Sequence, residues 1–313
     1  MKYPIFNQKE FSDEYCITFL RNTRFFIMYE TQLSTHSEPD SPPDPRGRPR
    51  NLHPSEVMTI LIAFHQSGYR TFKHFYLKHV CVYYRAEFPT LVSYPRFVQL
   101  KKEGLRLLTF YLSTHAGTCS GISFVDSTRL RVCDNKRISS HKVFAEKVSE
   151  RGKTSMGWFY GFKLHLIIND TGDILDVALT PGNRDDRSLL WGMNPETPLH
   201  GSLYGDRGYI SEDLREKLRK QGINLVYKVR KNMDPLEVSA SDEVLLKKRT
   251  LVESVIKELK TQTVLEHSRH RSFDNFYVNV FSALIAYQLS ENKPTLNFDE
   301  LQQSKDLPMP VNN

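Results

Sequence analysis

The chain lacks several features that would place it in common protein classes. It has only four cysteines, and no two of them form a Cys-x-x-Cys pair, so neither a zinc knuckle nor a disulfide framework is indicated. No apolar run approaches the roughly 18 to 20 residues that span a bilayer. The opening residues, Met1 to Glu10, lack the apolar core of a signal peptide. We therefore expect a cytoplasmic protein with reduced thiols and no membrane partner.

The chain does have an excess of basic residues. Lysine and arginine number 43 against 36 acidic residues, which gives a net charge of +7 and an isoelectric point near 9.1. This balance favours a polyanionic partner, most simply nucleic acid, although a merely basic soluble protein would share it.

The first 120 residues show helical patterns with one break. Apolar residues recur at helical spacing over residues 1–35, and residues 36–50 then hold several prolines and no large apolar residue. This break predicts an exposed, extended linker. Its basic end contains Arg46, Arg48 and Arg50, which either contact a DNA backbone or minor groove or remain solvated.

Helical patterns resume after the linker. A helix is expected to begin with Ser55 as its N-cap, an aromatic helix follows over residues 72–80, and a further helical stretch covers residues 94–112. This succession is compatible with a helix-turn-helix-like module, as it is with other small helical domains. The aromatic residues suit a hydrophobic core better than base stacking. We expect residues 1–120 to form an all-helical DNA-binding region.

The pattern changes to strands near residue 121. Short strands are predicted at 122–126 and 128–132, and the clearest alternation covers residues 159–169. A turn at 170–173 leads into a returning strand at 174–179. The remaining predicted elements are a short helix at 187–192, a strand at 203–204, a helix at 212–220, a strand at 223–229 and helices at 243–262 and 273–290. Residues 121–290 therefore predict an α/β domain with a mixed sheet, and residues 291–313 predict a disordered tail.

Three acidic residues occur in contexts that suit metal-assisted chemistry. Asp126 ends the first predicted strand, Asp206 follows a later strand, and Glu253 lies on the long helix. Hard divalent cations prefer oxygen ligands, and two such ions can clamp the attacking and the leaving oxygen of a phosphodiester. The three residues are therefore candidate metal ligands.

The helix that carries Glu253 adds cations beside this carboxylate. At 100° per residue, Arg249, Lys257 and Lys260 all lie within about 40° of Glu253. We interpret this face as a metal-binding carboxylate among phosphate-binding cations. The alternative is an ordinary amphipathic helix with ion pairs at i,i+4 spacing, from Arg249 to Glu253 to Lys257.

Other polar residues are weaker candidates. Lys163 and His165 share one face of their predicted strand, so both are candidate DNA contacts, although such a histidine is more often structural. Arg207, next to Asp206, is a further candidate DNA contact. Asp185 and Asp186 form a paired-carboxylate alternative to the triad, but a role in a turn or helix cap is at least as plausible.

Together these motifs resemble those of bacterial insertion-sequence transposases of the DDE type, which have a ribonuclease-H-like catalytic domain. The features that carry the resemblance are the helical module around Ser55 to Tyr76, Val125-Asp-Ser-Thr128, Gly161-Phe-Lys-Leu-His-Leu166, Pro181-Gly-Asn-Arg-Asp185, Gly205-Asp-Arg-Gly-Tyr209 and the run from Arg249 through Glu253 to Lys260. One position departs from the family pattern: Leu246 stands where a tyrosine usually precedes the arginine.

The resemblance implies a function and a set of ligands. It implies that Asp126, Asp206 and Glu253 bind Mg²⁺, with Mn²⁺ as a substitute, and that the protein binds the terminal inverted repeats of its element and its target DNA. It also implies metal-dependent DNA cleavage followed by strand transfer in a homo-oligomeric complex. A metal-dependent nuclease without strand transfer and a non-catalytic DNA-binding regulator are the alternatives.

Overall fold

The computed structural model describes residues 52–144, 150–154, 157–193, 198–229, 238–266 and 270–297. The chain divides into two compact units, one helical and one built on a sheet. The predicted helix at 1–35, the linker with Arg46, Arg48 and Arg50, and the tail after residue 297 lie outside the described residues.

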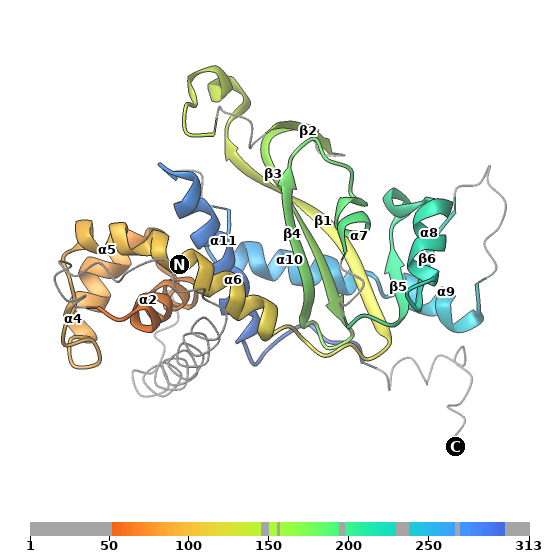
Figure 1. Ribbon diagram of the computed structural model, residues 1–313, viewed down its shortest axis with the longest axis horizontal. Helices are drawn as coiled ribbons and strands as arrows, with labels where there is room; N and C mark the ends of the chain where they lie inside the picture. The colour runs from red at the N-terminus through yellow and green to blue at the C-terminus, as the bar shows by residue number, and fades with distance from the viewer. Residues whose placement is uncertain are drawn as a thin grey trace, which may run out of the picture. The chain divides into compact units, whose positions relative to one another are not determined.

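The first unit is helical (Figure 1). Its elements are α2 (Pro54–Gln66), α3 (Phe72–Phe75), the π-helical turn η1 (Tyr76–Val80), α4 (Cys81–Tyr83), α5 (Tyr94–Leu100), the 3₁₀ turn η2 (Lys101–Glu103), α6 (Gly104–Thr114) and α11 (Phe273–Gln288). The N-cap of α2 is His53, which forms a capping box with Glu56, so the prediction of Ser55 as the cap was wrong. Pro54 occupies the first turn, where its missing N–H costs nothing.

Aromatic residues form the core of this unit. Phe75, Tyr76 and Phe97 have no exposed surface, and the Tyr76 and Phe97 rings lie 4.7 Å apart. The core interpretation of these aromatic side chains is therefore confirmed. α11, which the sequence had suggested was part of the α/β domain, packs against α2 and α6.

The second unit is built on a six-stranded mixed sheet flanked by helices. Its strands are β1 (Ile122–Cys133), β2 (Glu150–Thr154), β3 (Gly157–Asn169), β4 (Ile174–Pro181), β5 (Gly201–Gly205) and β6 (Ile223–Tyr227). Its helices and 3₁₀ turns are η3 (Asn135–Ser140), α7 (Ser188–Gly192), η4 (Arg207–Tyr209), α8 (Glu212–Arg219), α9 (Ala240–Lys247) and α10 (Thr250–Gln262).

The strand order places β1 in the middle of the sheet. The order is β2-β3-β1-β5-β6, and β4 pairs with β3 as well. β1 runs antiparallel to β3 along almost its whole length but parallel to β5 only from Ile122 to Phe124. β1 does not end at Asp126, as the sequence had suggested. It continues to Cys133, because β3 still pairs with it after β5 has ended.

Alternation along β1 separates two faces of the sheet. Val125 joins Ile167, Leu190 and Leu214 in an apolar cluster that covers one face with α7 and α8. Because neighbouring residues of a strand point to opposite faces, Asp126 points to the other face. α10 crosses that side of the sheet behind β1 in the view of Figure 1.

The long helix predicted over residues 243–262 is interrupted. α9 ends at Lys247 and α10 begins at Thr250, so Arg249 lies in the turn between them. Residues 291–297, part of the predicted tail, contact the sheet: Leu296 N donates to Asp170 O at 2.8 Å, and Lys293 Nζ lies 2.9 Å from Asp173 Oδ1.

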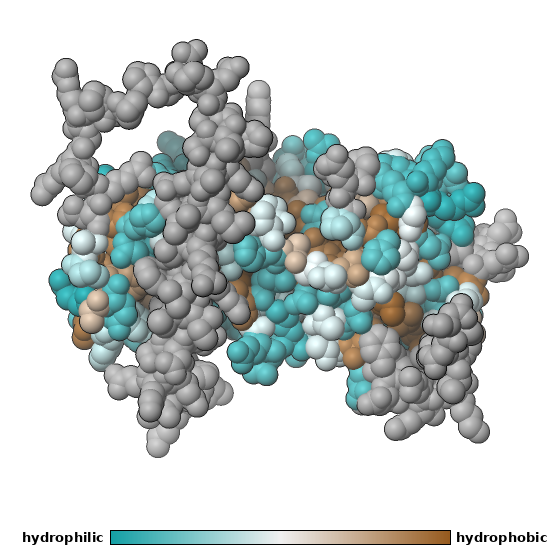
Figure 2. Space-filling view, turned by 60° about the horizontal axis from the view of Figure 1, so that its bottom comes forward, coloured by the Kyte–Doolittle hydropathy of each residue, from teal (hydrophilic) through white to brown (hydrophobic). Residues whose placement is uncertain are grey.

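The described surface is mixed in polarity. Figure 2 shows hydrophilic and hydrophobic side chains interspersed over one face of the molecule. No helix in the described ranges combines the length and apolar content needed to cross a membrane.

Candidate active site

Two of the three candidate carboxylates lie just beyond the parallel pairing of β1 and β5. The last β1–β5 pair is Phe124 with Tyr204. Asp126 and Asp206 each follow their member of this pair by two residues, so both lie just beyond the point where the parallel pairing stops. Asp206 also caps η4, because its Oδ1 accepts a hydrogen bond from Gly208 N at 2.8 Å.

Arg249 links the third carboxylate to the first. Its Nη1 lies 3.4 Å from Asp126 Oδ2, and its Nη2 donates to Glu253 Oε1 at 2.7 Å. Its side chain is 21% exposed. The Arg249–Glu253 ion pair that belongs to the alternative interpretation of this face is therefore present, and the same guanidinium connects α10 to β1.

Burial and the neighbouring charges shift the pKa of Asp126. Burial raises the pKa of Asp126 from 3.8 to about 6. The Ser127 backbone N–H, which donates to Asp126 Oδ1 at 2.7 Å, and the Arg249 guanidinium both lower this pKa, while the Asp206 and Glu253 carboxylates raise it. Asp206 and Glu253 are thus both close enough to Asp126 to affect its charge state.

These side chains offer the oxygen donors that Mg²⁺ and Mn²⁺ prefer. Across the described ranges, no three acidic, histidine or cysteine side chains are placed so that they could hold one ion together. The guanidinium of Arg249 bridges Asp126 and Glu253 instead, and it is the cation that balances them. The donor set fits a hard divalent ion in kind.

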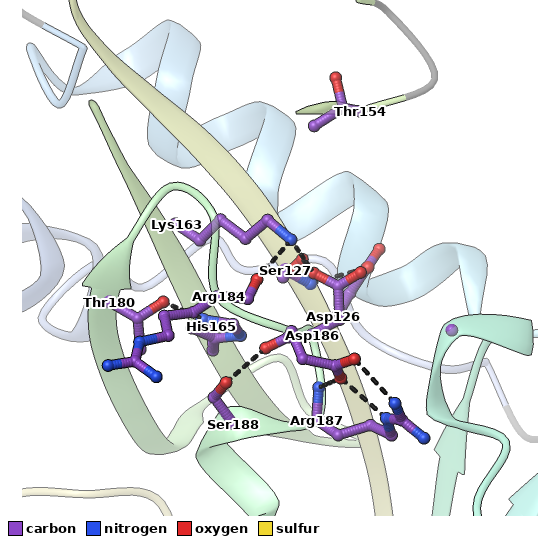
Figure 3. Close-up of polar contacts among 12 residues, drawn as sticks. Asp126, Ser127, Thr154, Lys163, His165, Thr180, Arg184, Asp186, Arg187 and Ser188 are labelled. Carbon is purple, nitrogen blue, oxygen red and sulfur yellow. Dashed lines mark hydrogen bonds and ion pairs between the residues drawn. The ribbon is translucent and has the colours of Figure 1, made fainter. Parts of the chain in front are cut away.

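Lys163 and His165 lie on the buried side of this region. Lys163 is 8% exposed, and its Nζ donates to Asp186 Oδ1 and to Arg184 O, both at 2.8 Å (Figure 3). His165 has no exposed surface, and its Nε2 is 2.8 Å from Thr180 Oγ1. Burial lowers the pKa of His165 to about 4, so the ring is neutral near pH 7. Since neither side chain offers a phosphate an open approach, we propose no DNA contact for them.

The other candidate cations differ in exposure. Lys257 and Arg207 are exposed. Lys260 is partly buried: its Nζ donates to Arg129 O at 2.9 Å and lies 3.8 Å from Glu266, and burial lowers its pKa. Lys257 and Arg207 are therefore better placed than Lys260 for contact with a phosphate.

The two adjacent aspartates after β4 have different partners. Asp185 Oδ2 lies 2.7 Å from Arg187 Nη2, and the Arg187 side chain holds the pKa of Asp185 at about 2. Asp186 instead accepts hydrogen bonds from Lys163 and from Ser127 Oγ, the latter at 2.6 Å. The sequence did not predict the Ser127–Asp186 contact, because the two residues lie far apart in the chain. The only signal was that Ser127 belongs to the Val125–Thr128 motif and that Asp186 follows the Pro181–Asp185 motif.

A cavity of about 670 Å³ opens next to the acidic residues. Asp206 and Arg249 line it, together with the cationic side chains of Arg207, Lys228 and Lys247. Leu246, the position that departs from the usual family pattern, is also part of the wall.

The fold and this site define a class of protein. Two carboxylates just beyond the parallel pairing of β1 and β5, with a further carboxylate from a helix, supply the kind of oxygen donors that two-metal nucleases and polymerases use. The chain matches the family described as the transposase DDE domain over residues 116–273, about half of its length. It belongs to this family of transposases, which act on DNA with the help of divalent metals. No curated protein and no solved structure gave a significant match.

Proposed function

We propose that this transposase cuts DNA at the ends of its own insertion sequence and joins the exposed ends to target DNA. The observation that supports the proposal most strongly is that Arg249 bridges Asp126 and Glu253, while the Asp206 and Glu253 carboxylates both raise the pKa of Asp126. These are the three residues that the family resemblance implies as metal ligands.

In this proposal each residue has a defined task. Asp126, Asp206 and Glu253 hold the divalent ions, which, when bound, supply charge to the attacking and leaving oxygens of the phosphodiester. The ionised form of Asp126 is the one that binds, and it predominates above pH 6. In-line displacement by water or by a DNA 3′-hydroxyl needs no protein nucleophile, so no tyrosine is required to form a covalent bond to DNA.

Arg249 has a second task in this proposal. It neutralises Asp126 and Glu253 in the metal-free protein, and once released from them its guanidinium would be available to the DNA strand. A guanidinium binds phosphate through paired hydrogen bonds. Exposed Lys257 and Arg207 extend the cationic surface for the DNA backbone, as sequence-independent contacts.

A two-step DNA assay tests the proposal. The full-length protein is incubated with Mn²⁺, a labelled duplex that carries the end of the element, and a supercoiled target plasmid. We expect a cut that leaves a 3′-hydroxyl, followed by label covalently joined to the plasmid. Cutting without joining would instead identify a metal-dependent nuclease, and binding without cutting would identify a DNA-binding regulator.

A further inference from the structure

A fourth carboxylate lies at the same edge of the sheet as the candidate triad. Asp186 occupies the loop between β4 and α7, and its Oδ1 accepts hydrogen bonds from Ser127 Oγ at 2.6 Å and from Lys163 Nζ at 2.8 Å (Figure 3). The Lys163 side chain is only 10% exposed and the Asp186 side chain is 38% exposed, so the lysine end of this ion pair is shielded from water. Charge-assisted hydrogen bonds of this kind are stronger than neutral ones. The loop is thereby fixed to β1 and β3.

Ser127 connects this loop to Asp126. Its hydroxyl donates to Asp186, while its backbone N–H donates to Asp126 Oδ1 at 2.7 Å. The Ser127 side chain points to the α7 face of the sheet and Asp126 to the α10 face, because side chains alternate along a strand. A shift of Ser127 therefore moves the hydrogen bond that orients the Asp126 carboxylate.

Asp186 also approaches Asp206. Both carboxylates face Gly208: a Cβ at this glycine would lie 2.9 Å from Asp206 Oδ1 and 3.5 Å from Asp186 Oδ2. Gly208 has no side chain to separate the two groups. The Asp186 loop therefore reaches the turn that presents Asp206 as well as the strand that presents Asp126.

The buried Tyr209 hydroxyl lies within electrostatic range of Asp126, Asp186 and Asp206. Tyr209 is 1% exposed, and its hydroxyl has no hydrogen-bond partner among the described residues. Burial raises the pKa of Tyr209 well above its usual value, and Asp126, Asp186 and Asp206 raise it further. Asp186 thus acts on the same group as the two candidate metal ligands.

We propose that Asp186 is a positioning residue of the metal site, which acts through Ser127 on Asp126 while Lys163 balances its charge. The inference rests on the proposed function, because it assumes that Asp126 is a metal ligand. Hydrogen-bonded partners that orient metal ligands are typically worth about 10- to 100-fold in metal affinity or activity. Asp186 would contribute in this way without reaching the substrate.

The experiment measures Mn²⁺ affinity by electron paramagnetic resonance on the full-length protein. Ser127→Ala removes only the hydroxyl and keeps the Lys163–Asp186 pair, and we expect it to weaken Mn²⁺ binding by about tenfold. Asp186→Asn should weaken binding by about 10- to 100-fold. Ser127→Thr, which restores a hydroxyl at the same position, should bind Mn²⁺ within about twofold of the wild type.

Two controls separate positioning from loss of fold. Ser188→Ala removes a hydroxyl from the neighbouring segment, where it donates to Asp185 O at 2.6 Å, and should leave Mn²⁺ affinity unchanged. Thermal unfolding in chelator checks that each variant is folded. Should Asp186→Asn fail to fold because Lys163 is left without its counter-charge, Ser127→Ala decides the question.

Wild-type Mn²⁺ affinity in folded Ser127→Ala would overturn the inference. Failure of this inference can be distinguished from failure of the proposed function. A wild type that binds Mn²⁺ without cutting or joining DNA would overturn the proposed function while leaving the Ser127→Ala comparison valid. A wild type that binds no Mn²⁺ would overturn both.

Discussion

Asparagine in place of Asp126 should stabilise the metal-free protein at neutral pH. The pKa of Asp126 is about 6 in the folded chain and 3.8 when unperturbed, so the folded state binds this proton more tightly than the unfolded state does. Folding of the ionised form therefore carries a cost that is absent below pH 3.8 and fully present above pH 6. A pKa difference of about 2 corresponds to ~3 kcal/mol.

The variant should recover part of this free energy. Asparagine still offers an oxygen to the Ser127 N–H, and Arg249 keeps its contact with Glu253. We expect a gain of about 1 to 3 kcal/mol, which for a domain of this size raises the melting temperature by roughly 2 to 10 °C. Such a gain on removing a functional charge is the usual trade-off between stability and activity.

The assay is thermal unfolding of wild type and Asp126→Asn in chelator at pH values from 4 to 8. The difference between the two proteins should be largest above pH 6 and should shrink toward pH 4. Added Ca²⁺ should reverse the order, because the ion binds the ionised carboxylate and stabilises the folded wild type. A variant that is no more stable than the wild type at pH 7.5 would refute this account of Asp126.

Three further predictions follow from the described contacts. Glu253→Gln should abolish cleavage while leaving DNA binding intact, and a gel shift beside a cleavage assay checks both. Lys257→Ala should weaken binding to end and random duplexes alike and lower the salt slope by about one, whereas partly buried Lys260 should change the slope less when replaced by alanine. A fragment that begins at residue 116 should aggregate more readily than the full chain in light scattering, because α11 would lose its packing against α2 and α6.

Much of the sheet could be predicted from local pattern. The alternation over residues 159–169 and the turn after Asn169 correspond to β3 and its hairpin with β4. Ser211 caps α8 through its hydroxyl, as its position before two acidic residues indicates. These features depend on neighbours within a few residues, and such information is present in the chain.

Features that depend on long-range pairing were missed. β2 was missed because its sequence has no alternating apolar pattern. It is an edge strand, and its pairing with the first residues of β3 cannot be read from its own residues. β1 continues beyond Asp126 only because β3 supports it from one side. The break at Arg249 was also missed, since the residues around it suit a continuous helix and the contact with Asp126 comes from a distant strand.

In the candidate site, too, the sequence motifs indicated candidate residues but not their long-range contacts. Asp126, Asp206 and Glu253 were predicted as metal ligands from their motifs, and the structure brings Asp126 and Glu253 to one guanidinium. The motifs did not show that Lys163 and His165 are buried, because alternation identifies a shared face without showing what covers it. Here α7 and the loop before it cover that face, and the Asp186 carboxylate meets Lys163 there.

The most direct test of the central claim is the rate at which Asp206→Asn cuts a duplex that carries the element end in Mn²⁺. This substitution keeps the cap on η4, because asparagine can still accept from Gly208 N, and removes one ligand charge. We expect wild-type cleavage that disappears in chelator, and a variant that binds the duplex normally but cuts it at least about 100-fold more slowly. Cleavage by Asp206→Asn at the wild-type rate, or cleavage by the wild type in excess chelator, would contradict the account.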